Sequence, residues 1–96
     1  LPAEEPTGLA IDTALNLLFA GAESKLAIIN YTTGKLVKTI KIGEGCDGVA
    51  YNAKNKTLFT SNGSGSISII KANKNNDFDK KNVTKIFFQI FLLKFI

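Results

Sequence analysis

Histidine and arginine are absent from the 96 residues, and cysteine occurs once, as Cys46. Without histidine, the chain cannot by itself form a histidine metal site, a Ser-His-Asp triad or an imidazole acid/base pair. A single cysteine excludes an internal disulfide. Arginine is the side chain that reads phosphates and guanine edges in a bidentate way. Its absence makes the net charge of +4, from twelve lysines and eight acids, a weak argument for nucleic-acid binding.

The bulk composition is that of a small globular domain. Hydrophobic residues make up 45% of the chain and charged residues 21%, which lies outside the range of disordered segments. A chain of this length forms at most one small domain. The opening residues, LPAEEP, have neither the basic head nor the apolar run of a signal peptide, and no methionine begins them. We therefore expect the sequence to start inside a longer protein.

The chain repeats itself with an offset of 40 residues. The segment GLAIDTALNLLFAGAES from Gly8 aligns with GVAYNAKNKTLFTSNGS from Gly48. One inserted residue in the next turn shifts the offset to 41, so that LAII at 26–29 aligns with ISII at 67–70. A repeat of this length is typical of propeller blades and of helical arrays. The choice between strands and helices therefore decides the fold.

The apolar runs of each copy are short, rich in Ile, Val, Phe and Leu, and separated by turns with Asn, Asp, Gly or Ser. This pattern predicts strands. Lys35, Lys38 and Lys41 interrupt the fourth run, as in an outermost strand whose charges discourage edge-to-edge pairing. The third turn of the second copy, 72–82, is predicted to be long. We expect strands at 8–12, 17–22, 25–30, 35–42, 48–52, 57–62, 66–71 and from about 82.

These elements resemble the repeat of the YVTN-type, YncE-like seven-bladed β-propellers. The first copy gives PTGLA at 6–10, Asp12, LFAG at 18–21, LAIIN at 26–30 and IKIG at 40–43, in the order of that repeat. The second gives GVA at 48–50, Asn52, LFTSN at 58–62 and ISII at 67–70. Cys46 stands where the first copy has Pro6. The resemblance covers roughly residues 6 to 72.

The resemblance implies an all-β fold of two four-stranded antiparallel propeller blades from an incomplete propeller, with an atypical apolar C-terminal tail. Residues 6–45 would form the first blade and 46–88 the second, with 1–5 as a linker or the end of a preceding blade. Two blades cannot close a ring that needs at least four, so the remaining blades of the same propeller are expected partners. The family further implies a periplasmic or extracellular location. No cofactor is expected from the residues of this chain.

The tail at 87–96 fits nothing in that repeat. With Ile86 it reads IFFQIFLLKFI and holds four of the seven phenylalanines, Phe87, Phe88, Phe91 and Phe95. It is too short for a membrane span, which needs about 20 residues, and exposed it would promote aggregation. Residues with A/T-rich codons dominate it, so we expect the last dozen or so residues to be out of frame.

Three short motifs suggest chemistry but are predicted to be turns or loops. GEGCDG at 43–48 has the spacing of a dinucleotide-binding loop, yet another strand and no helix is expected after it. NGSGS at 62–66 could form a phosphate nest, but it aligns with a hairpin turn and does not end in Lys-Ser/Thr. Asp77 and Asp79 alternate like calcium ligands, without the glycine and closing glutamate of a calcium loop.

Single residues give no stronger site. Cys46 has no histidine to activate it and is predicted to be a small buried hydrophobe. Glu4 and Glu5 precede the repeat and are expected in a solvated linker, not as an acid/base pair. The glycosylation triplets matter only in a eukaryotic secretory setting. They begin at Asn30, Asn55, Asn62 and Asn82.

The sequence therefore favours a non-catalytic binding or scaffold module. Its ligand would be an unknown protein or small molecule bound by loops at one end of a propeller. Two alternatives stay open. One is a propeller enzyme or cofactor-binding protein whose active residues lie in other blades. The other is weak nucleic-acid binding through lysines. No catalytic, cofactor-binding or metal-binding residue is predicted in this chain.

Overall fold

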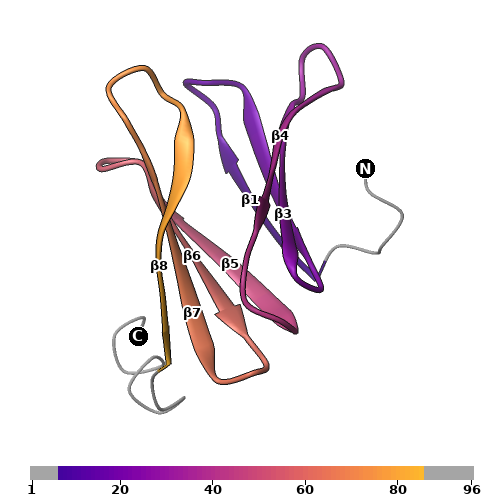
Figure 1. The fold of residues 1–96 in the computed structure, drawn as a ribbon. Coiled ribbons are helices and arrows are strands. Elements are labelled where there is room, and N and C mark those ends of the chain that lie inside the picture. The colour runs from indigo at the N-terminus through magenta and orange to yellow at the C-terminus, as the bar shows by residue number, and fades with distance from the viewer. Residues whose placement is uncertain (1–6, 86–96) are drawn as a thin grey trace.

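A computed structural model describes residues 7–85, and among these the side chains of residues 7–80. The described chain folds into two four-stranded antiparallel sheets, each with its strands in sequence order (Figure 1). The all-β fold expected from the sequence is confirmed. Residues 7–85 contain no helix long and apolar enough to cross a membrane. The strands are β1 (Gly8–Asp12), β2 (Leu17–Ala22), β3 (Lys25–Asn30), β4 (Lys35–Lys41), β5 (Cys46–Asn52), β6 (Thr57–Asn62), β7 (Ser66–Ala72) and β8 (Phe78–Lys85).

The predicted strand boundaries agree with the structure to within one residue except at β5, which begins at Cys46, two residues before the predicted Gly48, and at β8. That strand begins at Phe78, four residues before the predicted start near Asn82, and the turn before it is correspondingly short. The prediction was wrong because the charges of DFDKK were taken for a loop. An outermost strand tolerates such charges, and Phe78 between them is 2% exposed and pairs with Ala72 of β7. The tail and residues 1–5 lie outside the described residues.

The two sheets are copies of one another in backbone detail as well as in sequence. Asn16 and Lys56, at equivalent places before β2 and β6, both adopt a left-handed conformation, with φ of 59° and 52°. Each outer pair of strands also carries a bulge at the same place, where Val37 of β4 and Lys81 of β8 are the extra residues. Asn prefers the left-handed region and Lys does not, so the shared conformation at Lys56 follows from the repeated turn.

The hydrophobic core lies between the two sheets. Its buried side chains come from the face of the first sheet that meets the second, and from the opposing face of the second. Strands β1 and β2 contact β5, and β4 contacts β8, so the sheets meet along their whole width. The buried members of this core are Leu17, Phe19, Leu26, Ile28, Ile40, Ile42, Cys46, Leu58, Ile70 and Phe78.

Gly8 allows the two innermost strands to approach closely. A Cβ atom at Gly8 would lie 2.7 Å from the backbone nitrogen of Val49, a separation that real Cβ atoms do not show. Gly48 is its equivalent in the second sheet, and a Cβ there would meet nothing within 4 Å. Glycine is required at the first position by contact with a neighbouring backbone, whereas the second position is open.

Candidate functional site

Three aromatic rings form the centre of the contact between the sheets. Phe19 of β2 is fully buried, and its ring centroid lies 4.8 Å from that of Tyr51 and 5.2 Å from that of Phe78. Such tilted and edge-on pairs add about 0.5–1.5 kcal/mol to the burial of each ring. The aromatic cluster therefore holds the sheets together.

Asp12 and Tyr51 form the main polar contact between the inner strands. The Tyr51 hydroxyl donates to Oδ2 of Asp12 at 2.5 Å, and the backbone N–H of Leu15 donates to Oδ1 at 2.9 Å. Burial alone would raise the pKa of Asp12. The hydrogen bonds from Tyr51, Leu15 and Ala14 outweigh this effect, together with the charge of Lys56, so the pKa of Asp12 is lowered. Burial and the hydrogen bond to Asp12 raise the pKa of Tyr51. The pair is therefore carboxylate and neutral phenol.

We expect Tyr51→Phe to destabilise the fold at neutral pH by about 1.5–3 kcal/mol, as for a lost hydrogen bond to a charged group. A lowered carboxyl pKa stabilises the folded state above the unfolded value of 3.8 and ceases to do so as pH falls through the folded value. Urea denaturation from pH 7 down to about pH 2 should therefore show the difference between the two proteins narrowing below pH 4.

Tyr31→Phe is the matched control for this experiment. The Tyr31 hydroxyl donates to Asn16 Oδ1 at 3.3 Å on the exposed surface. Its removal should change the free energy of unfolding by less than about 0.5 kcal/mol at any pH. A difference between wild type and Tyr51→Phe that stays constant with pH would contradict the charged pair.

A buried polar network in the second sheet holds residues 42–45, the segment that connects the two sheets. The Asn62 side chain donates to Ser66 Oγ at 3.1 Å and Ser68 Oγ at 3.2 Å, and accepts from Thr60 Oγ1 at 3.0 Å. The backbone N–H of Gly43 donates to Ser68 Oγ at 2.9 Å. Among the described side chains, no buried nitrogen or oxygen is without a hydrogen-bond partner. The network is fully satisfied and so stabilises the fold.

The glycine-rich motifs form the turns of this same region. Residues 42–45 connect β4 to β5, and β5 begins inside GEGCDG at Cys46, where a dinucleotide site would need a helix. In NGSGS the backbone N–H groups of Gly63 and Ser64 donate to the carbonyl groups of Gly45 and Glu44 at 2.6 and 3.3 Å. These N–H groups already have acceptors, so they do not form a phosphate nest.

The other candidate residues are also engaged in the fold. Cys46 is 2% exposed, and burial raises the pKa of its thiol, which favours the unreactive form. No group of three potential metal ligands occurs among the described residues. Asn62 is buried and so inaccessible to a glycosylating enzyme. Glu4 and Glu5 lie outside the described residues.

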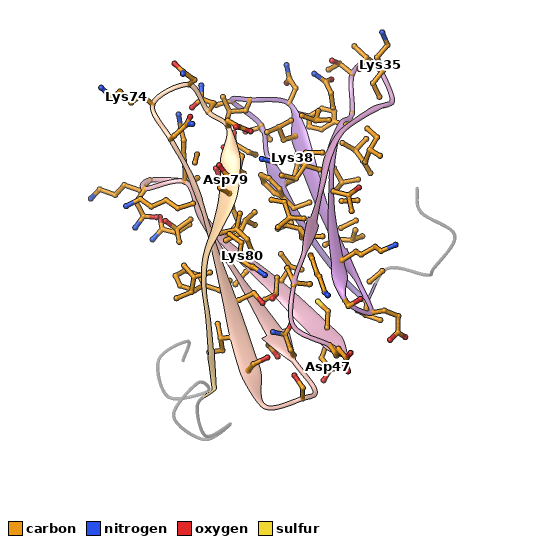
Figure 2. The ribbon with its side chains drawn as sticks, in the orientation of Figure 1. Lys35, Lys38, Asp47, Lys74, Asp79 and Lys80 are labelled. Atoms are coloured by element: carbon orange, nitrogen blue, oxygen red, sulfur yellow. The ribbon has the colours of Figure 1, made fainter. Side chains whose placement is uncertain are left out.

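Asp77 and Asp79 bind a lysine of the other sheet. Lys38 Nζ donates to their Oδ1 atoms at 3.3 and 2.8 Å and to the carbonyl oxygen of Phe78 at 2.9 Å (Figure 2). The hydrogen bond to Asp79, followed by Asp77, raises the pKa of Lys38. Exposed pairs of this kind contribute about 0–1 kcal/mol each. The lysine predicted to protect an edge instead links β4 to the start of β8.

The described lysines of the turns gather at one end of the sheets, a feature that the sequence analysis missed. Each sheet is a meander, so alternate turns lie at the same end. We call the end formed by 13–16, 31–34, 53–56 and 73–77 the basic end. Lys56 Nζ donates to Asn76 Oδ1 at 2.6 Å and joins two of these turns. Lys35 and Lys74 lie at this end and Asp47 at the other (Figure 2). The basic end carries Lys35, Lys54, Lys56 and Lys74 together with Asp77, and the opposite end carries Glu23, Glu44 and Asp47 together with Lys25 and Lys41.

The face of the second sheet that points away from the first is hollowed near the basic end. The hollow has a volume of about 400 Å³ and is lined by Ala50, Tyr51, Asn52, Ala53 and Phe59. Asn52 Oδ1 accepts from the backbone N–H groups of Lys54 and Asn55 at 3.0 and 3.4 Å. Tyr51 is the only ionisable residue among these five, and its hydroxyl already donates to Asp12. The other four are apolar or neutral, so the hollow can bind an apolar group.

No family model and no curated protein matches the chain.

Proposed function

We propose that the chain is a non-catalytic binding and scaffold module built from two consecutive blades of a β-propeller of the YVTN type. The observation that carries this proposal is the way the sheets stack. Two copies of one four-stranded meander pack in the same sense through unlike faces, with the innermost strands β1 and β5 in contact. Packing of this kind can continue from sheet to sheet around an axis, as propellers require. An extracytoplasmic location is proposed from the family resemblance alone.

The basic end is the proposed binding surface. Its turns are exposed and rich in lysine and asparagine with Asp77 as their one acid, whereas the opposite end carries three acids and two lysines. Such a separation of charge orients an approaching charged partner and raises its association rate. The partner supported best is therefore an acidic protein segment.

The catalytic alternative has less support. Asp12, Tyr51, Cys46 and the polar side chains around Asn62 are all paired within the fold. An enzyme would need its reactive groups outside the described residues. Nucleic acid is the second candidate partner, and the lysines of the basic end favour it. Exposed phosphates would bind there by charge, with a strong dependence on salt.

Binding of a ten-residue polyglutamate peptide to the immobilised chain tests the proposal at about 50 and about 200 mM salt. We expect binding that weakens as salt rises. Reversing two charges with Lys54→Glu and Lys74→Glu should weaken it by about tenfold at the lower salt, if each contact contributes somewhat under 1 kcal/mol.

Lys25→Glu with Lys41→Glu is the matched control. These exposed lysines pair across β3 and β4 at the other end of the sheet. This double variant should leave binding unchanged. Equal losses in both double variants would show that only net charge matters and would contradict a binding surface at the basic end. Tighter binding of a single-stranded oligonucleotide than of the peptide would favour the nucleic-acid candidate.

A further inference from the structure

The contact between the sheets joins two different rows of side chains. Each row runs across a sheet along cross-strand neighbours. The first sheet contributes Ala10, Phe19 and Ile28, which we call the Phe row. The second sheet contributes Tyr51, Leu58 and Ile70, which we call the Tyr row. The contact therefore joins the Phe row of one sheet to the Tyr row of the other.

The faces that point away from this contact carry the complementary rows. Side chains alternate between the faces of a strand, so each outer face holds the neighbours of the residues just named. On the second sheet these are Ala50, Phe59 and Ile69, which have the same residue types as the Phe row. On the first sheet they are Ile11, Leu18 and Ile29, which are equivalent to the Tyr row and apolar throughout.

The outer row of the first sheet is partly open to solvent. Ile11 is 53% exposed and its neighbour Leu9 is 58% exposed, whereas Phe19 and Ile28 of the inner contact are at most 1% exposed. Clustered apolar side chains at this level of exposure mark an interaction surface more often than isolated ones do. Ala50 lines the hollow on the other outer face. One molecule thus presents both halves of an interface that it already contains.

We propose that a second copy of this chain docks head to tail, with Leu9 and Ile11 of one molecule on Ala50 and Asn52 of the next. The new contact repeats the geometry of the contact between β1 and β5 inside each molecule. This inference rests on the packing of the two sheets and not on the binding role proposed above. Because the contact joins unlike faces, it continues beyond a dimer unless the chain of copies closes into a ring.

The charges at the two positions support this occupant. Inside the molecule the carboxylate of Asp12 is buried against the Tyr51 hydroxyl, which donates to it. In the docked copy their equivalents are Asn52 and Ile11, a neutral amide and a side chain without a hydroxyl. The oxygen of Asn52 is already satisfied by its own turn. At these two positions docking therefore buries no unpaired charge, which would cost several kcal/mol.

The backbone of the second sheet also leaves space for the docked strand. Gly8 sits against the backbone of Val49, and the equivalent Gly48 has nothing within 4 Å of a built Cβ. The β1 strand of a second copy would occupy that space. Lys25 is one poor match, because it is equivalent to Ser66, which is 5% exposed in the contact inside the molecule. Ser61 is another. It stands where the first sheet has Gly21, whose built Cβ would lie 2.8 Å from Cγ2 of Val49. We expect Ser61 to keep the association weak.

Sedimentation velocity of the full chain tests the proposal at protein concentrations from about 1 to about 300 μM. This concentration range detects an association free energy of about −5 to −8 kcal/mol. The expected result is a sedimentation coefficient that rises with concentration. Leu9→Lys blocks one face and Ala50→Lys the other, and each should weaken association at least about tenfold because it buries an unpaired charge. Gly48→Ala should do the same by steric overlap, without disturbing the fold. Tyr31→Lys, an equal change at a turn, should have no effect.

A mixture of the Leu9→Lys and Ala50→Lys proteins separates the head-to-tail contact from a symmetric one. Each variant retains the face that the other has lost, so the mixture should form heterodimers and nothing larger. Ser61→Gly should tighten the association of the otherwise unchanged chain. The proposal is overturned if the wild type stays monomeric throughout, if either lysine variant associates normally, or if the mixture gives no heterodimer. A Ser61→Gly protein that associates no better than wild type would contradict the proposed register.

Discussion

Phe19→Ala is expected to remove about 3–5 kcal/mol from the free energy of unfolding, the range for truncating a fully buried phenylalanine. Phe19 is 0% exposed and contacts the rings of both Tyr51 and Phe78 in the second sheet. The substitution leaves a cavity at the centre of the contact between the sheets, and both sheets lose their shared anchor. A domain of this size has about 5–14 kcal/mol of total stability, so the substitution removes a large fraction of it.

Urea denaturation followed by circular dichroism measures this effect. In thermal denaturation the melting temperature should fall by more than about 12 °C, since each kcal/mol of lost stability corresponds to about 4–8 °C in a domain of 60–100 residues. Tyr31→Ala provides the comparison, because Tyr31 is 40% exposed in a turn and its loss should cost less than about 0.5 kcal/mol. A Phe19→Ala protein as stable as the Tyr31→Ala protein would show that the two sheets do not share this core.

Gly8→Ala and Gly48→Ala are expected to differ widely although the two glycines are equivalent in the repeat. A Cβ at Gly8 would lie 2.7 Å from the nitrogen of Val49 and 2.9 Å from the carbonyl carbon of Gly48. Backbone atoms cannot rotate away, so the inner strands must separate, at a cost of about 2–3 kcal/mol. The same methyl group at Gly48 meets nothing within 4 Å, and its effect on stability should stay within about 0.5 kcal/mol.

Both variants should be compared at a protein concentration low enough to keep the chain monomeric, so that self-association does not contribute. Neither glycine has the positive φ that would itself penalise alanine. The difference between the two variants therefore reports the approach of β1 to β5. Equal stabilities, or a more damaged Gly48→Ala protein, would contradict the packing described for the inner strands.

Local patterns predicted most of the strands because turn residues and apolar alternation define them. The turns after Asp12 and Asn52 and the glycines of the hairpins could be placed from their chemistry alone. The start of β8 could not. Phe78 lies between two aspartates, and its burial depends on Phe19 and Tyr51 of other strands, which local sequence does not reveal. The bulges that the structure shows in both outer strand pairs align β8 with β4.

The candidate site was harder to predict than the fold. Asp12 and Tyr51 are 39 residues apart, and neither looked unusual until the packing of the sheets placed hydroxyl against carboxylate. The basic end was missed because its lysines are spread along the sequence. A meander brings alternate turns to one end, so summing charge over every second turn would have found it. Asp77 and Asp79 drew attention as ligands for a cation, and the cation that they bind is Lys38.

The most direct test of the stacked repeat is a nuclear Overhauser spectrum of the monomeric chain at low concentration. The structure predicts contacts from the Phe19 ring to the rings of Tyr51 and Phe78, and from the Gly8 Hα atoms to the Val49 amide. A spectrum in which Phe19 and Gly8 contact only residues of their own sheet would contradict the account.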